Sequence, residues 1–449
     1  MNETLIYKFG GSCLKGSSDV ESICSRIIES EGDRLLVVVS AFHGVTDRIL
    51  TRLDNNDLET LDAFVASIEL SYLEMVPSVV GSRFEDRFNE ALTRLSESLA
   101  HHDGHLVSED TDCPCRAESL ACGERLSSIA IAAALEARGV DSTPIWADEA
   151  GIRITTLDGS SSIDLTSTKE SFGLANEGVM VLTGWFGVEG DEVKLLSRGG
   201  SDLSATSLAA VLDASSVTIW RDVPGVLALA PKWSIPSRNL SYLSYTEAQE
   251  LALFSEPMLH PMAVEPLRQR GIPLHLRPLH DPDSPGSCIG PSIGTGVPEV
   301  RAVGCLPRLV PLTFGLSGAV SVAKIVSAAT TLLERSRVRV WSLMAKPTEA
   351  RFLISERHAS RAVRILSEHE FIPTPKRGEA IALLCLVGES IGVEPSVAER
   401  IDLLQEETGI VLTPLDEGRR NHALHFTVPA AETHRALTAL AKDWDLLSA

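Results

Sequence analysis

The chain has 449 residues, of which 44% are apolar and 22% charged, and this is typical of an ordinary globular protein with about two to four domains. The composition excludes disordered, collagen-like and disulfide-rich chains, and the net charge of −21 disfavours nucleic acid or an anionic membrane as a partner. No apolar run reaches the roughly 18 residues of a membrane span and no signal-peptide pattern precedes the first strand, so we expect a cytoplasmic protein.

The first forty residues predict a β-α-β unit. Leu5–Phe9 is a short apolar strand that ends at two glycines, and Ser18 with Glu21 forms the capping pattern of a helix start. The uninterrupted apolar run Leu35–Val39 is typical of a parallel strand that is covered on both faces.

Residues 47–118 interrupt this pattern with apolar positions at helical spacing, so we expect a helical excursion that covers the sheet. Strands then alternate with helices, which predicts an α/β domain over residues 1–295 with a mostly parallel central sheet between helices. The expected elements are helices at Ser119–Arg138, Ser201–Leu212, Glu247–Phe254 and Pro261–Arg270, and strands at Thr143–Trp146, Val179–Thr183, Val217–Trp220 and Pro273–Leu276.

A segment rich in Pro, Gly and Ser, residues 281–296, marks a domain boundary. Beyond it, residues 296–449 show the order β-α-β-β-α twice, first over residues 310–367 and again over residues 380–441. Each repeat has about 65 residues and is marginal alone, so we expect the two to pack together or across a dimer. Short units of this kind leave sheet edges open, which favours a homodimer or a higher homo-oligomer.

The eight cysteines are scattered through a long chain, which indicates reduced thiols. One cluster holds His101, His102, His105, Cys113 and Cys115. A zinc site and a polar loop with incidental thiols are both open interpretations, but the spacing matches no paired Cys-x-x-Cys pattern. We therefore assign no metal ligand in this chain.

The first candidate site is the end of the first strand, where Lys8 precedes Gly10, Gly11 and Ser12. The two commonest nucleotide-binding loops, GxxxxGK[ST] and GxGxxG, are absent from the sequence. A lysine at a strand end beside two glycines places an ammonium where the backbone approaches a phosphate closely. A strand end with an ordinary glycine turn is the alternative.

Two further candidates lie at a predicted helix start and inside a predicted helix. Free N–H groups before the helix at Ser201 attract anions, and Arg198 is suited to bidentate binding of a carboxylate. Asp202 is suited to orienting a lysine or to binding magnesium through water, with a glycine turn and an acidic cap as the alternative. Glu124 and Arg125 are charged residues inside an otherwise apolar helix, so each must be exposed to solvent, paired with a charge or bound to a ligand. An exposed helix face is the simplest interpretation, and contact between Glu124 and a ligand ammonium is the functional one.

Together these segments resemble the aspartate kinases of the amino-acid kinase superfamily, and the resemblance covers nearly the whole chain. It is carried by KFGGS (8–12), the SAxxGVT loop (40–46), GERLS (123–127), LTGWFG (182–187), SRGGSD (197–202), WRDVPGV (220–226) and LHP (259–261). The resemblance implies an amino-acid kinase catalytic domain over residues 1–295, followed by tandem ACT-like regulatory domains of α+β, ferredoxin-like type over residues 296–449.

The resemblance also implies an activity, which is transfer of the γ-phosphoryl group of ATP to the side-chain carboxylate of L-aspartate, with Mg²⁺. The product is 4-phospho-L-aspartate, in the first step of aspartate-family amino-acid biosynthesis. The implied catalytic residues are Lys8 and Asp202. The implied aspartate-binding residues are Ser40, Thr46, Glu124, Arg198, Gly199, Gly200 and Ser201, and the implied ATP-binding residues are Gly10, Gly11, Ser12, Arg221, Asp222, Gly225 and Lys232.

The substrate side matches the family, whereas the nucleotide side departs from it at Arg221, Leu227, Lys232 and Pro257. Pro257 stands where the family has a lysine, and our hypothesis is that Arg221 supplies the missing positive charge. Two other functions stay open, namely a kinase of the same fold that acts on another amino acid or carboxylate, and a non-catalytic amino-acid sensor. The segment at 387–390 is similar to the family's, which is compatible with an amino-acid effector such as lysine or threonine. A dimerisation platform without effector is the alternative.

Overall fold

The computed structural model describes residues 3–32, 34–54, 59–104, 114–157, 159–173, 178–197, 199–254, 259–294, 299–315, 320–415 and 422–448. The chain divides into two compact units. The first holds residues 1–226, 239–252 and 257–293, and the second holds residues 227–238, 253–256 and 294–449. Among the described residues, no helix is both long enough and apolar enough to cross a membrane.

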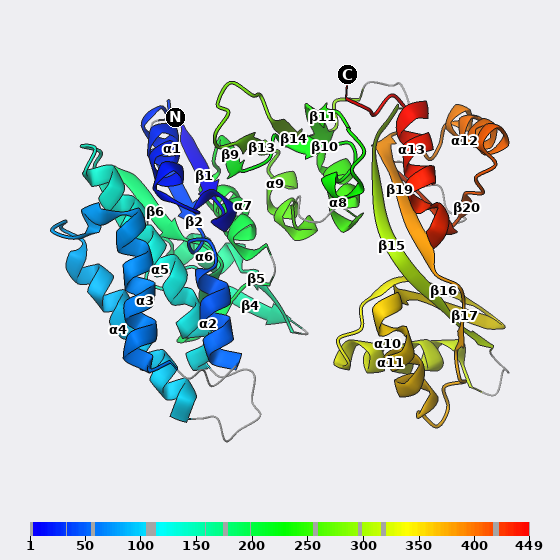
Figure 1. The fold of residues 1–449 in the computed structure, drawn as a ribbon, viewed down its shortest axis with the longest axis horizontal. Coiled ribbons are helices and arrows are strands. Elements are labelled where there is room, and N and C mark those ends of the chain that lie inside the picture. Colours follow the sequence, from blue (N-terminus) through cyan, green and yellow to red (C-terminus); the bar gives the residue numbers. More distant parts are fainter. Residues whose placement is uncertain are drawn as a thin grey trace. The chain divides into compact units, whose positions relative to one another are not determined.

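The first unit is built on an eight-stranded sheet in the order β12-β14-β13-β9-β1-β2-β6-β3 (Figure 1). β13 and β14 pair antiparallel, whereas β2, β9 and their neighbours pair parallel, which confirms the predicted α/β class. The strands are β1 (Thr4–Phe9), β2 (Arg34–Val39), β3 (Ser142–Ile145), β6 (Val179–Thr183), β9 (Ser216–Arg221), β12 (Tyr242–Ser244), β13 (Leu274–Pro278) and β14 (Ser287–Gly290). Three short two-stranded sheets accompany it: β4 (Ile154–Leu157) with β5 (Ser160–Ile163), β7 (Phe186–Glu189) with β8 (Glu192–Leu195), and β10 (Val226–Leu227) with β11 (Asn239–Leu240).

Helices cover this sheet and carry the predicted excursion. α7 packs on β1, β2 and β9, α5 packs on β3 and β6, and the excursion helices α2, α3 and α4 pack on α5. The helices are α1 (Ser17–Ile28), α2 (Val45–Asp54), α3 (Leu61–Met75), α4 (Glu85–Gly104), α5 (Pro114–Glu136), α6 (Leu165–Ser171), α7 (Gly200–Leu212), α8 (Tyr245–Phe254) and α9 (Glu265–Arg268).

Several predicted helices are wrong in detail. The helix expected at Pro261–Arg270 is a 3-10 turn, Pro261–Ala263, followed by the short helix α9, Glu265–Arg268. α5 begins at Pro114, five residues before the expected start, because proline suits the first helical position, where its missing N–H costs nothing. The N-cap of α1 is Gly16, which makes no side-chain cap, so Ser18 and Glu21 do not form the predicted capping pattern. The carboxylate of Asp19 instead accepts a hydrogen bond from the Lys15 backbone N–H at 2.8 Å.

The second unit is built on one antiparallel sheet in the order β16-β17-β15-β19-β21-β20, with β18 also paired to β15. Its strands are β15 (Glu299–Gly315), β16 (Val340–Lys346), β17 (Glu349–Ser355), β18 (Lys376–Arg377), β19 (Ile381–Glu389), β20 (Thr413–Pro414) and β21 (Ala423–Pro429). Its helices are α10 (Val322–Arg335), α11 (Glu356–Ser367), α12 (Pro395–Thr408) and α13 (Thr433–Asp443).

The 17-residue strand β15 begins before the first predicted repeat: residues 310–315 belong to that repeat, whereas residues 299–309 were predicted in neither. Its first part pairs with β19 from Glu299 to Leu309, and its second part pairs with β17 from Leu309 to Gly315. A bulge between Leu306 and Leu309, where Arg308 has a φ of 53°, accommodates Pro307 without ending the strand. The two β-α-β-β-α repeats therefore share a single sheet within the second unit.

Candidate active site

A cavity of about 410 Å³ opens at the carboxyl ends of β1, β2 and β6, where parallel α/β sheets usually bind ligands. Each of these strands contributes a lining residue: Lys8 lies at the end of β1, Ser40 follows β2, and Trp185 follows β6. Asp202 comes from the first turn of α7, and Glu124 comes from the middle of α5. The three segments that the sequence singled out thus meet at one cavity.

Two cations share one buried carboxylate on one side of the cavity. Lys8 Nζ lies 2.5 Å from Asp202 Oδ1, and Arg221 Nη2 donates to Asp202 Oδ2 at 2.8 Å. Lys8 and Asp202 are only 7% and 6% exposed. Burial alone would raise the pKa of Asp202, but the charges of Lys8 and Arg221 and their hydrogen bonds outweigh it and hold this pKa below its usual value. Two cations therefore lie on one carboxylate at this cavity, an arrangement suited to an anionic ligand.

The cavity also holds a second carboxyl group, which forms no ion pair with any residue that the structure describes. Glu124 is 2% exposed; its Oε1 accepts a hydrogen bond from the Ala41 N–H at 3.2 Å, and its Oε2 has no hydrogen-bond partner among the described residues. Burial raises the pKa of Glu124 to about 8, although the Ala41 N–H and the charges of Arg125 and Lys8 act in the other direction. A ligand ammonium that reached Oε2 would supply the missing counter-charge.

Arg125, the neighbour of Glu124, points away from the cavity and serves the fold. Its guanidinium is fully buried, with ion pairs to Glu118 at 2.5 Å and Asp148 at 2.8 Å. It also lies over the rings of Trp146 and Phe186, at 5.2 Å and 5.1 Å from their centroids. The two charges that interrupt this apolar helix thus have different partners, one in the protein and one in the cavity.

Glycines allow the backbone to approach the charged groups closely. A Cβ at Gly10 would lie 3.0 Å from Lys8 Nζ, so a side chain there would press on the ammonium. Gly199 has a φ of 76°, and a Cβ at this position would lie 2.6 Å from the Cβ of His260. The turn before α7 therefore requires glycine for both its conformation and its packing.

The structure brings most of the predicted site residues to this cavity. Those that line it are Lys8, Gly11, Ser12, Ser40, Thr46, Glu124, Gly199, Gly200, Ser201 and Asp202. Arg198 and Pro257 lie outside the described residues. His43, Asp47 and Trp185 also line the cavity and were not predicted as site residues, although His43 and Trp185 stand inside the motifs SAxxGVT and LTGWFG.

The remaining predicted nucleotide residues do not line the cavity. Asp222 pairs with Lys15, with Nζ and Oδ2 2.8 Å apart at a partly exposed position. Gly225 has a φ of 135° and turns the chain tightly against Ser287. Lys232 belongs to the second unit, where its ammonium lies 5.8 Å from the ring centroid of Trp233.

The histidine and cysteine cluster of the excursion is only partly described, because His105 and Cys113 lie outside the described residues. His102 contacts the Leu53 carbonyl oxygen at 3.0 Å and Cys115 Sγ at 4.0 Å. Cys115 is disulfide-bonded, so the expectation of uniformly reduced thiols is wrong at this residue, whereas the other six described cysteines form no disulfide. A thiol in a disulfide is not a thiolate ligand, which leaves the zinc interpretation without this sulfur.

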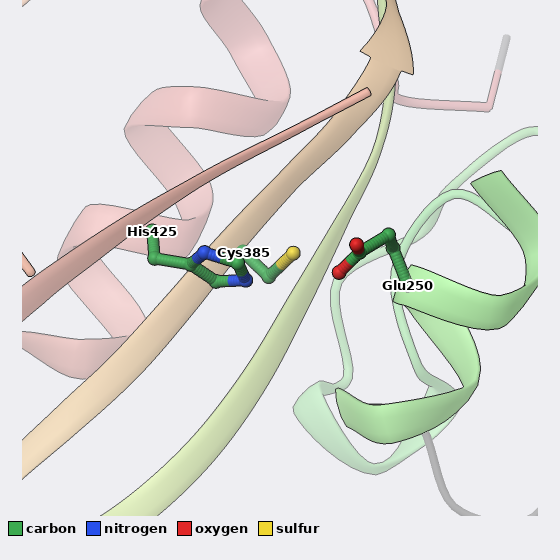
Figure 2. A group of neighbouring side chains, drawn as sticks. All are labelled: Glu250, Cys385 and His425. Atoms are coloured by element: carbon green, nitrogen blue, oxygen red, sulfur yellow. The ribbon is translucent and has the colours of Figure 1, made fainter. Parts of the chain in front are cut away.

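A cysteine and a histidine also face each other in the second unit. Figure 2 shows Cys385 on β19 and His425 on β21, which are direct partners in the antiparallel register. Glu250 is drawn in the same view but lies on α8 of the first unit, so we do not treat it as part of a site with Cys385 and His425. Two side chains alone do not make the four-ligand set of a structural zinc site.

Known proteins with matching sequences and folds are kinases. Residues 3–278 match the model of the "Amino acid kinase family". The bifunctional aspartokinase/homoserine dehydrogenase of Daucus carota is 29% identical over 63% of this chain, which spans 32% of the length of that protein. Lysine-sensitive aspartokinase 3 of Escherichia coli is 24% identical over 98% of this chain and 99% of its own. The structure of E. coli aspartokinase III with aspartate and ADP superposes with a TM-score of 0.80 at 21% identity, over 98% of this chain and 99% of the other, a likeness of fold.

Proposed function

The chain belongs to the amino acid kinase family, and on that premise we propose that it transfers the γ-phosphoryl group of ATP to the side-chain carboxylate of L-aspartate. The product is 4-phospho-L-aspartate, the first intermediate of aspartate-family amino-acid biosynthesis. The observation that supports the proposal is one cavity that holds the Lys8–Asp202–Arg221 group together with the Glu124 carboxyl, whose Oε2 has no hydrogen-bond partner among the described residues. A small dicarboxylic amino acid beside a polyphosphate matches both sides.

Aspartate binding uses the side of the cavity that holds Glu124. Its free Oε2 accepts the α-ammonium, and the resemblance assigns the α-carboxylate to Arg198. The backbone N–H groups from Gly199 to Ser201 lie at the start of the 13-residue helix α7, where the helix dipole favours negative charge. Ser40 and Thr46 line the same cavity and complete the proposed substrate contacts.

Phosphoryl transfer uses the side that holds Lys8. The substrate carboxylate is already a nucleophile, so the reaction needs no general base, and catalysis consists of positioning and charge neutralisation. Lys8 neutralises the charge that spreads over the transferring group, and Asp202 holds its ammonium in place. A bound Mg²⁺ would supply further neutralisation of phosphate charge, and Asp202 is the residue that would hold it. Because both Asp202 oxygens already accept from cations, this residue fits such an ion through water.

The nucleotide and effector parts of the proposal rest on the family resemblance and on residue placement. Gly10, Gly11 and Ser12 form the loop beside Lys8, and the proposed nucleotide residues beyond it are Arg221, Asp222, Gly225 and Lys232. The E. coli relative is named lysine-sensitive, and by analogy we assign an amino-acid effector, lysine or threonine, to the ACT-like second unit. Its sheet ends in β16 and β20, and pairing through such edges favours a homodimer or a higher homo-oligomer.

The deciding experiment is a turnover assay with ATP·Mg in which hydroxylamine traps the acyl phosphate as a hydroxamate. We expect hydroxamate formation with L-aspartate and none with D-aspartate or succinate, which fail to place an ammonium at Glu124 in the required geometry. Turnover of L-glutamate without L-aspartate would move the function to another acidic amino acid. Binding of amino acids with no turnover of any would leave a sensor and overturn the kinase proposal.

A further inference from the structure

One buried hydroxyl connects the helical excursion to the wall of the cavity. Tyr72 lies on α3 and is fully buried. Its Oη donates to the Gly123 carbonyl oxygen at 2.7 Å and lies 3.1 Å from Ser127 Oγ, so it holds α3 to α5. The same Oη accepts from the Phe42 N–H at 3.5 Å, which ties it to the loop after β2.

Both backbone partners of this hydroxyl are direct neighbours of the groups that set the position of Glu124. Gly123 immediately precedes Glu124, and Phe42 immediately follows Ala41, whose N–H donates to Glu124 Oε1 at 3.2 Å. The Tyr72 hydroxyl therefore fixes the distance between the donor of that hydrogen bond and its acceptor.

Packing around Tyr72 leaves this arrangement little freedom. The rings of Phe42 and Tyr72 stack with centroids 4.4 Å apart, and Phe88 packs against Tyr72 at 6.2 Å. A Cβ at Gly123 would lie 2.8 Å from the Ala41 Cβ, so the loop and α5 are already in close contact. Small changes in the separation of the loop from α5 thus move the Ala41 N–H relative to the carboxyl group.

We propose that Tyr72 is a positioning residue for the ammonium-binding carboxyl of Glu124. Its hydroxyl clamps the Ala41–Phe42 loop to α5, keeps the Ala41 N–H on Oε1 and leaves Oε2 directed to the substrate. The inference rests on the proposed function for the identity of the ligand, an α-amino acid. It also assigns the excursion helix α3 a role at the cavity, which its place in the sequence does not suggest.

The electrostatics of Glu124 provide a readout that packing alone would not change. The charges of Lys8 on β1 and of Arg125 on its own helix lower the pKa of Glu124, and Tyr72 on α3 also interacts with it. The other titratable groups that line the cavity with Glu124, among the described residues, are His43, Asp47 and Asp202. The Ala41 N–H bond lowers the pKa of Glu124, opposing burial. Loss of the clamp weakens that bond, so the pKa of Glu124 rises further and the ionised carboxylate forms only at higher pH.

The test is Tyr72→Phe, which removes the hydroxyl and keeps the stacked ring. We expect the aspartate KM at pH 7.5 to rise about fivefold, as for loss of one buried hydrogen bond, with kcat and the ATP KM within about twofold of wild type. In a plot of aspartate affinity against pH, the midpoint of the transition should lie at a higher pH for the variant than for wild type. An unchanged aspartate KM and pH profile would overturn the proposal.

Tyr245→Phe is the matched control, because Tyr245 is also buried and donates its hydroxyl to a backbone carbonyl, that of Ile272, at 2.6 Å. It should lower the melting temperature by a similar amount and leave the aspartate KM unchanged. Equal effects of both variants on KM would show a general loss of stability and contradict the assignment. If Tyr72→Phe does not fold, Ser127→Ala replaces it, since it removes one partner of the same hydroxyl and predicts the same direction of change.

Failure of the proposed function would be visible separately. If wild-type protein turns over no aspartate, the kinase proposal fails, and the positioning claim is then judged on the carboxyl group itself. Titration of glutamate labelled with ¹³C at the side-chain carboxyl, assigned with Glu124→Gln, follows Glu124 without any ligand. An upward shift in Tyr72→Phe, absent in Tyr245→Phe, supports the clamp, and an unshifted titration rejects it.

Discussion

Two carboxyl groups of the cavity are buried to nearly the same extent, but the pKa of one is lowered and the pKa of the other is raised. We name their surroundings the phosphoryl side (Lys8, Asp202 and Arg221) and the ammonium side (Glu124 with the Ala41 N–H). Asp202 is 6% exposed and its pKa is lowered, whereas Glu124 is 2% exposed and its pKa is raised to about 8. Burial is therefore not what separates them. Two neighbouring cations keep Asp202 ionised, whereas Glu124 forms no ion pair within the described part of the chain, so we expect the ammonium of a ligand to ionise it.

The largest expected effect comes from removing the cation of the phosphoryl side. Lys8→Ala should lower kcat about a thousandfold and change aspartate binding only modestly, because Lys8 acts on the charge that develops during transfer. Steady-state kinetics with titration calorimetry for aspartate measure both quantities. Lys169→Ala, which removes an exposed lysine paired with Asp213, is the control and should leave turnover unchanged. Near-normal turnover of Lys8→Ala would remove this residue from the mechanism.

On the ammonium side, Glu124→Gln keeps the shape of the side chain and removes its charge. The aspartate KM should rise about a hundredfold, the cost of leaving a ligand ammonium without its counter-ion, with a smaller change in kcat. Glu247→Gln is the matched control. Glu247 is also buried and accepts a backbone N–H, from Ser244 at 2.7 Å, but does not line the cavity. If both variants bind aspartate equally well, the comparison between the two sides fails.

Arg221→Ala tests whether the second cation of the phosphoryl side also serves the nucleotide. We expect the ATP KM to rise about tenfold, because the variant removes one of the two cations beside Asp202 and leaves Asp202 Oδ2 without this donor. An unchanged ATP KM would show that Arg221 orients Asp202 but does not contribute to ATP binding. Arg277→Ala, at the neighbouring strand position opposite Trp220, removes a guanidinium outside the cavity and should not affect the ATP KM.

The smallest expected effect is a pH dependence of stability that Glu124 alone introduces. Its pKa is about 8 in the folded protein against an ordinary value of 4.5, so between these values the folded protein holds a proton that the unfolded chain has lost. The stability from this group is fully present below pH 4.5 and is lost as the pH rises through 8. Without ligand, the melting temperature of wild type should therefore fall relative to Glu124→Gln by a few degrees between pH 5 and pH 8. A constant difference between the two proteins across this range would show that Glu124 is not shifted.

Much of the fold and of this cavity is predictable because local sequence patterns determine it. The apolar run of β2 and the helical spacing of apolar positions in α2, α3 and α4 identify elements whose burial follows from their composition. Local patterns mark Lys8, Asp202 and Glu124 as candidates, because they lie at glycine turns or inside an apolar helix, whereas their proposed roles come from the family resemblance.

The contacts that are not predictable join segments far apart in the chain. The bond between Tyr72 and Gly123 spans 51 residues, and tyrosine on an apolar helix face gives no sign of a buried acceptor. The target of Arg221 depends on the lateral spacing of β9 and α7, which no local pattern encodes. The continuity of β15 past Pro307 was missed because proline argues against a strand interior, and only pairing on both sides compensates for it.

The strand β15 couples the two parts of the sheet in the second unit mechanically. β15 pairs with β19 along one part and with β17 along the other, so displacement of this shared strand disrupts both parts of the sheet. A displacement at one end of β15 is transmitted to the other end through a continuous strand of 17 residues. The second unit should accordingly melt in one cooperative step, and a molecule bound beside either half would be sensed in both.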